Sequence, residues 1–86
     1  MSESTVAVDS ADVWPADAAD VEEAVVATWF VREGAAVEVD DTLCEIQIEK
    51  VSVDVPAPAS GELVEQTVPE NGEFRRGDTL GRIRTE

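Results

Sequence analysis

Hydrophobic and polar residues alternate along the chain on both sides of a short break near its middle. The stretches CEIQI (residues 44–48) and VSVDV (residues 51–55) each place an apolar residue at every second position. Period-two alternation predicts a half-buried strand on each side of the break. Opposed residues of an antiparallel pair share a face, so Ile48 and Val51 can close a hairpin with the dipeptide Glu49-Lys50 at its tip.

Similar apolar stretches of strand length occur elsewhere in the sequence. They predict further strands over residues 5–8, 24–31, 37–39, 61–68, 74–76 and 79–84. Glycine, asparagine and aspartate predict intervening turns at Gly34, Asp40-Asp41 and Asn71-Gly72. Proline cannot donate a backbone hydrogen bond, so Pro56 and Pro58 end the strand after the hairpin. Residues 1–4 are expected to form a flexible tail and residues 5–86 a single domain.

The segment between the first two predicted strands is rich in aspartate. DSADVWPADAAD (residues 9–20) is polar and interrupted by Pro15, which predicts a surface loop. Trp14 within it has two interpretations. It anchors the loop on the body of the domain, which is the more frequent role of a lone loop tryptophan, or it is an exposed recognition residue.

An internal repeat relates the two halves of the chain. Asp41-Thr42-Leu43 followed by Ile46 recurs as Asp78-Thr79-Leu80 followed by Ile83. At the same offset further positions match in pairs: Ala24 with Gly61, Val26 with Leu63, Val31 with Val68, and Val37 with Phe74. Each half, of about four short strands, is too thin to be stable alone, so the halves are expected to pack together and bury a shared apolar face. Only the first copy continues into the Glu49-Lys50 hairpin.

The composition narrows the range of functions. Histidine is absent, which removes the usual general base and the commonest metal ligand. No glycine-rich phosphate loop and no metal-ligand spacing occur, so the chain is not expected to be an enzyme or to bind a metal by itself. The single cysteine, Cys44, lies on the inward face of a predicted strand, which favours a small core residue over a nucleophile and excludes an intramolecular disulfide.

The chain is strongly acidic, with a net charge of −14 from 20 acidic and 6 basic residues. Phosphate contacts need lysine and arginine, so this charge argues against a nucleic-acid partner. The acidic residues are spread over the whole chain, which favours adaptation to a high-salt cytoplasm over a specific acidic docking face. No signal-peptide-like or membrane-length apolar stretch occurs, so we expect a soluble cytoplasmic protein without a membrane partner.

Lys50 is the only lysine in the sequence. A surface without lysine except at the tip of one hairpin indicates a site where an amine serves as a chemical handle. The Glu-Lys dipeptide is also not among the favoured hairpin turns, so a requirement other than turn propensity explains it better. An ordinary exposed turn lysine would give the same pattern, and the residues alone leave both interpretations open.

Three stretches carry a pattern specific enough to suggest a family: VREGAAV (31–37), DTLCEIQIEKVSVDVPAPASGEL (41–63) and NGEFRRGDTLGRI (71–83). Over roughly residues 5–85 the chain resembles the lipoyl domains of 2-oxo acid dehydrogenase complexes, within the biotinyl/lipoyl carrier family. In that family an acidic residue, usually aspartate, precedes the modified lysine and a small or β-branched residue follows it, as Glu49 and Val51 do here. The resemblance implies an all-β fold: a flattened barrel or sandwich of two four-stranded antiparallel sheets with quasi-twofold symmetry.

The resemblance also implies a carrier that other enzymes act on. Lipoate would be joined by an amide to Lys50, through a lipoate ligase or an octanoyltransferase with a lipoyl synthase, and Glu49 and Val51 would be flanking recognition residues. The resulting swinging arm would be reductively acylated by a 2-oxo acid dehydrogenase, would deliver the acyl group to coenzyme A on a dihydrolipoyl acyltransferase, and would be reoxidised by a dihydrolipoamide dehydrogenase. The domain itself is expected to be a monomer.

Two features depart from the family pattern. Asp40 stands where glycine is common, and Asn71 stands where the first half has Gly34. Asparagine and aspartate tolerate positive φ, so both turns are still expected. The loop over residues 9–22 is longer than usual, and in lipoyl domains the corresponding loop lies near the lysine hairpin and is read by partner enzymes.

Three alternatives remain beside a lipoyl carrier. A biotin carrier flanks its lysine with methionines, whereas the only methionine here is Met1 and Glu49 places a charge beside the lysine. The carrier protein of glycine cleavage is also lipoylated but is usually longer, with helical additions. An unmodified interaction module could use the same fold, because fold does not fix function.

Overall fold

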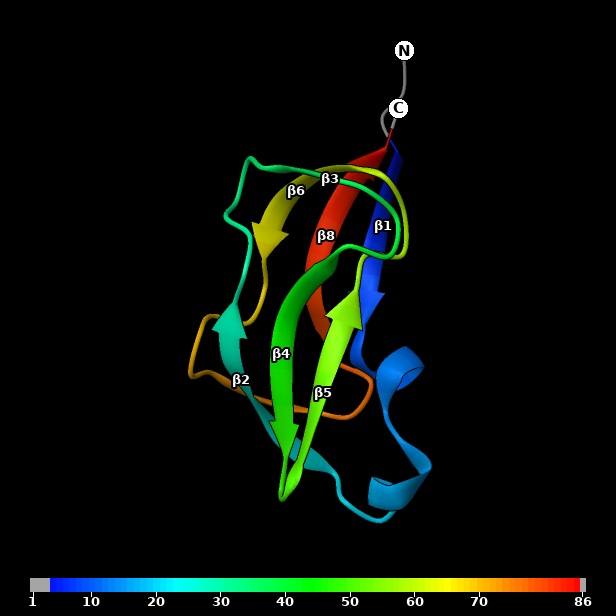
Figure 1. Cartoon of the computed structure of the whole chain (residues 1–86), viewed down its shortest axis with the longest axis vertical. Helices are drawn as coiled ribbons and strands as arrows, with labels where there is room; N and C mark the ends of the chain where they lie inside the picture. The colour runs from blue at the N-terminus through cyan, green and yellow to red at the C-terminus, as the bar shows by residue number, and fades with distance from the viewer. Residues whose placement is uncertain (1–3, 86) are drawn as a thin grey trace.

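The computed structural model describes residues 4–85 and shows two four-stranded antiparallel sheets packed face to face (Figure 1). In chain order the strands are β1 Ser4–Asp9, β2 Glu23–Trp29, β3 Ala36–Val37, β4 Thr42–Ile48, β5 Val51–Pro56, β6 Gly61–Gln66, β7 Glu73–Arg75 and β8 Thr79–Thr85. The strand order is β1-β8-β6-β3 in one sheet and β5-β4-β2-β7 in the other. The expected all-β sandwich of two four-stranded sheets is therefore confirmed. The molecule is elongated, measuring 42 × 18 × 18 Å.

The internal repeat is confirmed in the turns that precede β4 and β8. The carboxylate of Asp41 accepts a hydrogen bond from the backbone N–H of Glu38 at 2.9 Å, and that of Asp78 accepts one from the backbone N–H of Arg75 at 2.8 Å. These pairs occupy matching positions in the two copies. Aspartate side chains often stabilise turns through such bonds to nearby backbone. The sequence motif Asp-Thr-Leu is repeated because each copy needs the same turn.

Matching turns also share an unusual backbone conformation. Gly34 has a φ of 93° and its counterpart Asn71 a φ of 68°, while Asp40 has a φ of 75° and its counterpart Gly77 a φ of 96°. The left-handed region costs most L-residues energy, but asparagine and aspartate are tolerated there. The expectation that Asp40 and Asn71 can replace glycine in these turns is confirmed.

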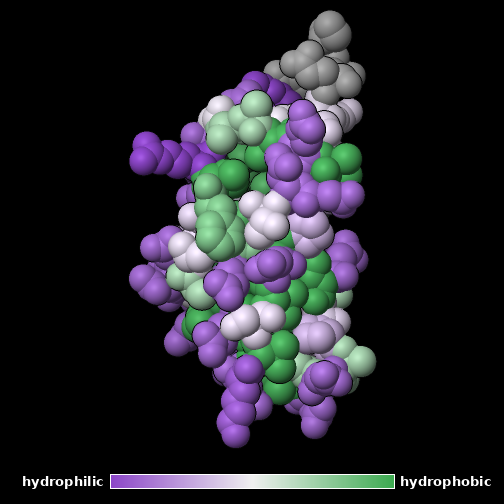
Figure 2. Space-filling model, in the orientation of Figure 1, coloured by the Kyte–Doolittle hydropathy of each residue, from purple (hydrophilic) through white to green (hydrophobic). Residues whose placement is uncertain are grey.

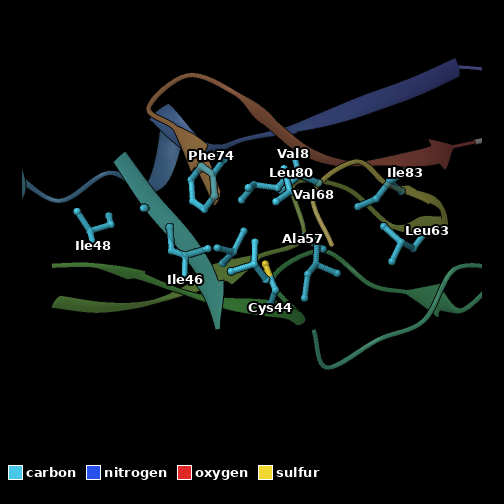
Figure 3. Close-up of a cluster of buried hydrophobic side chains, with 14 of the residues drawn as sticks. Val8, Cys44, Ile46, Ile48, Ala57, Leu63, Val68, Phe74, Leu80 and Ile83 are labelled. Atoms are coloured by element: carbon cyan, nitrogen blue, oxygen red, sulfur yellow. The ribbon is translucent and has the colours of Figure 1, made fainter. Parts of the chain in front are cut away.

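The core lies between the sheets, and many of its residues are matched by the repeat (Figure 3). Val26 and Leu63, Leu43 and Leu80, and Ile46 and Ile83 are all fully buried. Figure 3 shows buried side chains that extend from Ile48 at one end to Leu63 and Ile83 at the other. Full burial of one such side chain contributes about 1.5–3 kcal/mol, so the shared face supplies most of the stabilisation.

Cys44 is part of this core, as its position on an inward strand face predicts. Its side chain is completely buried, and burial raises the pKa of its thiol to about 12. A buried protonated thiol is a poor nucleophile and metal ligand. Its role is therefore packing.

Several predicted strand limits are wrong at their C-terminal ends. The strand expected over 24–31 ends at Trp29, and Phe30 is 56% exposed; the strand expected over 61–68 ends at Gln66. The short strand expected over 37–39 is observed at Ala36–Val37, and Val39 lies beyond it with 53% of its surface exposed. Apolar residues that follow a strand directly continue its pattern, so hydrophobicity alone cannot mark where pairing stops.

The N-terminal boundary also differs. Ser4, expected in the tail, begins β1 and pairs with Thr85 of β8. The rest of the expected tail, residues 1–3, lies outside the described residues.

Candidate functional site

The hairpin of β4 and β5 has the predicted register. Ile48 pairs with Val51, which leaves Glu49 and Lys50 as the two residues of the turn. Glu49 adopts a φ of 55°, and the Gln47 side chain donates a hydrogen bond from Nε2 to the Glu49 carbonyl oxygen at 3.1 Å. A two-residue hairpin needs positive φ at a central position, and here Glu49 supplies it with support from Gln47.

Lys50 and Glu49 are exposed, whereas Val51 is half-buried. Within the described chain Lys50 has no hydrogen-bond or ion-pair partner. An amine that carries a covalent group must be reachable by the enzyme that attaches it and must tolerate losing its charge. Lys50 meets the first condition because it is exposed, and the second because no hydrogen bond or ion pair among residues 4–85 involves its ammonium group.

The hairpin tip lies at one end of the long axis of the molecule (Figure 1). Ser4 and Thr85, paired at the outer ends of β1 and β8, lie at the other end. Hydrophilic residues project at the end where the hairpin lies (Figure 2). A group attached to Lys50 would therefore extend away from the body into solvent.

Two open surface hollows flank the hairpin and share Glu23 and Glu49. The larger, of about 500 Å³, is lined by Glu23, Ala24, Val25, Gln47, Glu49, Glu73, Phe74 and Arg75. The second is lined by Asp20, Val21, Glu22, Glu23 and Glu49. Three of the eight residues that line the larger hollow are acidic, against one arginine, and four of the five that line the second are acidic, so a protein that approaches Lys50 meets a mainly negative surface.

The Asp-rich loop forms two short 3₁₀ helices, η1 Ser10–Val13 and η2 Ala16–Ala18, where an irregular surface loop was predicted. The carboxylate of Asp9 begins η1 by accepting a hydrogen bond from the Ala11 N–H at 2.9 Å. Short aspartate-capped turns of this kind need no apolar periodicity, so the hydrophobic pattern does not predict them. The loop's last residues lie beside Glu49 in the second hollow, which confirms that the loop approaches the lysine hairpin.

Trp14 anchors this loop, which confirms the first of its two interpretations. Its ring is half-buried and packs edge-on against Phe74, with the ring centroids 6.3 Å apart. Its indole Nε1 donates to the Ala18 carbonyl oxygen at 2.9 Å. The Arg76 guanidinium lies over the same ring, 5.9 Å from the centroid. Trp14 is therefore held by an aromatic contact, a cation–π contact and a hydrogen bond from its indole N–H.

Sequence analysis did not identify Arg75 or the acidic groups of β2 and β7 as neighbours of the hairpin. Glu23 pairs with Arg75 across the β2–β7 ladder, and their side chains lie 4.0 Å apart. No short motif links these residues, so only the strand pairing brings them together. Among residues 4–85 no group of His, Cys, Asp and Glu could hold a metal ion. Nor does any helix in this part of the chain have the length and apolarity needed to cross a membrane.

Comparison with known proteins identifies the family. A family model for biotin and lipoyl domains, described as "Biotin-requiring enzyme", matches residues 13–83. The chain is 38% identical over 63 residues to the dihydrolipoyllysine-residue succinyltransferase component of the 2-oxoglutarate dehydrogenase complex from Bartonella vinsonii subsp. berkhoffii. It is 36% identical over 63 residues to the dihydrolipoyllysine-residue acetyltransferase component of the pyruvate dehydrogenase complex from Staphylococcus aureus. Each match covers 73% of this chain and 15% of the relative, so the chain corresponds to a small part of those proteins.

The motifs around the lysine hairpin, the duplicated sandwich and these matches agree with one another. The resemblance read from the sequence is thus confirmed: the chain belongs to the biotinyl/lipoyl family and is homologous to the lipoyl domains of 2-oxo acid dehydrogenase complexes.

Proposed function

We propose that the protein is a lipoyl carrier domain whose attachment site is Lys50. The observation that carries this proposal is the placement of the only lysine of the sequence at the exposed tip of the β4–β5 hairpin. Attachment would form an amide between Lys50 Nζ and the carboxyl carbon of lipoate, with loss of a proton from the amine and of the leaving group from the activated carboxyl. Once attached, lipoate supplies a dithiolane for redox and acyl-transfer chemistry.

The chain's own residues present that group and do not act on it. The hairpin is held by the β4–β5 ladder up to Ile48 and Val51, so Lys50 is displayed from a rigid base. A rigid base and a flexible arm together give a high effective concentration of the carried group at neighbouring active sites. The protein would therefore be a substrate of other enzymes and not an enzyme itself.

The flanks of Lys50 favour lipoate over biotin. Glu49 precedes the lysine and Val51 follows it, whereas biotin carriers have methionines at these positions. The relatives named above are dihydrolipoyllysine-residue proteins, which supports the same choice. On this proposal the partners are a lipoate-attaching enzyme, a 2-oxo acid dehydrogenase, a dihydrolipoyl acyltransferase and a dihydrolipoamide dehydrogenase, all in the cytoplasm.

We also propose that the loop of residues 10–22 is part of the surface that the 2-oxo acid dehydrogenase recognises. Its end shares a hollow with Glu49, next to the attachment site. Replacing residues 11–19 with a Gly/Ser linker of equal length should spare lipoylation, which needs mainly the hairpin, but should sharply reduce reductive acylation. If the wild type and the linker variant are acylated at the same rate, the loop only connects β1 to β2.

The attachment site is tested by Lys50→Arg, which keeps the positive charge but cannot form the amide. Protein from its native host, analysed by intact mass and probed with anti-lipoate antibody and avidin, should carry one lipoyl group in the wild type and none in the variant. Circular dichroism and melting temperature should match between the two. A lipoyl mass increment on the variant contradicts the assignment to Lys50, and an avidin signal on the wild type favours the biotin alternative.

A further inference from the structure

The turn between β7 and β8 holds both ends of the loop over residues 10–22. At the start of the loop, Ser10 is fully buried; its N–H donates to the Asp78 carbonyl oxygen at 3.1 Å, and its hydroxyl accepts from the Gly77 N–H at 2.9 Å. At the end of the loop, the backbone N–H of Arg76 donates to the Glu22 carbonyl oxygen at 2.9 Å. The loop is thus fixed to a segment that is distant in sequence.

The Arg76 side chain adds two hydrogen bonds to the loop. Its Nη1 donates to the Ala19 carbonyl oxygen at 2.7 Å, and its Nη2 donates to the Glu22 carboxylate at 2.9 Å. The same guanidinium lies over the Trp14 ring. A planar guanidinium can make two directed hydrogen bonds and stack on an aromatic ring at the same time, whereas a lysine ammonium cannot.

These contacts determine where the end of the loop lies. Ala19 and Glu22 bracket Asp20 and Val21, and residues 20–22 line the hollow that includes Glu49. Because Arg76 fixes the residues on both sides, it fixes this part of the surface next to Lys50. Trp14 holds the preceding 3₁₀ helix, η2, through the hydrogen bond from its indole N–H to the Ala18 carbonyl oxygen.

We propose that Trp14 and Arg76 are positioning residues: they hold the loop in the conformation that a 2-oxo acid dehydrogenase recognises beside Lys50. This inference rests on the proposed lipoyl function. An ordered loop lowers the entropic cost of docking, because its residues need not be immobilised when the partner binds. Neither residue belongs to the β4–β5 hairpin, so their effect is on partner recognition and not on attachment.

The test compares Arg76→Lys and Trp14→Phe with matched controls elsewhere in the fold. Arg82→Lys changes an arginine that pairs with Glu65 at 3.5 Å, and Trp29→Phe removes an indole N–H that donates to the Val68 carbonyl oxygen at 2.8 Å. All four proteins are lipoylated with a lipoate ligase. They are then assayed with the source organism's pyruvate or 2-oxoglutarate dehydrogenase component, whichever acylates the wild type.

For Arg76→Lys and Trp14→Phe we expect KM for reductive acylation to rise by about tenfold with little change in kcat, as expected when several side chains must be ordered on binding. Attachment rates should stay within about twofold of wild type, because the hairpin is unchanged. The control variants should retain the wild-type KM. Trp14 is the sole tryptophan in Trp29→Phe, so its fluorescence anisotropy should fall when Arg76→Lys is added.

Wild-type KM in both test variants would overturn the inference, as would an equal loss of attachment and acylation, which indicates a general folding defect. Failure of the proposed function itself would look different. The wild type would then take no lipoate at Lys50, or would not be acylated by either dehydrogenase, whatever residue stands at position 76.

Discussion

Ile48 and Val51 form the last antiparallel pair of the β4–β5 hairpin, and only Glu49 and Lys50 lie beyond them. The two turn residues therefore have separable roles. Glu49 provides the positive φ that closes the turn, and Lys50 provides the exposed amine. The turn conformation and the attachment point can therefore be changed separately, at Glu49 and at Lys50.

Glu49→Gly should make the domain more stable but a poorer substrate for lipoate attachment. Glycine adopts a φ near 55° without strain, so we expect the free energy of unfolding in urea to rise by about 0.5–1 kcal/mol. The attaching enzyme should modify the variant more slowly, because the carboxylate before Lys50 is gone. Glu49→Asp, which keeps the charge, is the control. A destabilised glycine variant would contradict the proposed strain at Glu49.

Gly61→Ala should be strongly destabilising. A Cβ at this position would lie 2.1 Å from the backbone oxygen of Arg84, so the β6 and β8 backbones would have to separate. We expect the free energy of unfolding to fall by about 3 kcal/mol or more, which is the upper end of the usual cost of overpacking a core. Gly34→Ala is the comparison, since its Cβ meets no atom within 4 Å and only its φ of 93° opposes the change. Equal melting temperatures for the two variants would contradict the steric argument.

The stability of the domain should fall in alkaline solution because of Cys44. Burial holds the pKa of its thiol at about 12, whereas an unfolded chain ionises it near pH 9. As the pH rises, the thiol therefore loses its proton in the unfolded state before it does in the folded state. The stabilisation that the protonated thiol gives the folded state is complete below pH 9 and falls by about 1.4 kcal/mol per pH unit up to about pH 12. The slope of unfolding free energy between pH 8.5 and 10.5 should be smaller in Cys44→Ala. The sequence has no tyrosine, so tyrosine ionisation does not contribute to this slope.

The melting temperature should rise as KCl increases from millimolar to molar concentration. A net charge of −14 causes repulsion within the folded chain, and molar salt shortens the screening length to about 3 Å. The increase should be smaller near pH 4, where many carboxylates are protonated. A flat or falling melting temperature at neutral pH would count against adaptation to high salt.

The sequence predicted the hairpin and the core because both depend on local, repeated patterns. Period-two alternation identified the pairing of Ile48 with Val51, and the repeat identified buried partners such as Leu43 and Leu80. The surface around Lys50 could not be predicted in the same way. It depends on contacts such as Arg76 to Glu22, which join residues 54 positions apart and leave no periodic signal.

The pairing of Ser4 with Thr85 has a consequence for protein engineering. The repeat matches Thr85 with Ile48, and Ser4 pairs with Thr85 as Val51 pairs with Ile48, so β8 and β1 form the same strand pair as β4 and β5 but without a connecting turn. Joining Thr85 to Ser4 through a Glu-Lys dipeptide, and opening the chain in the loop over residues 10–22, would build a circular permutant with a second lysine tip. Such a molecule would display two attachment sites at opposite ends of a body 42 Å long.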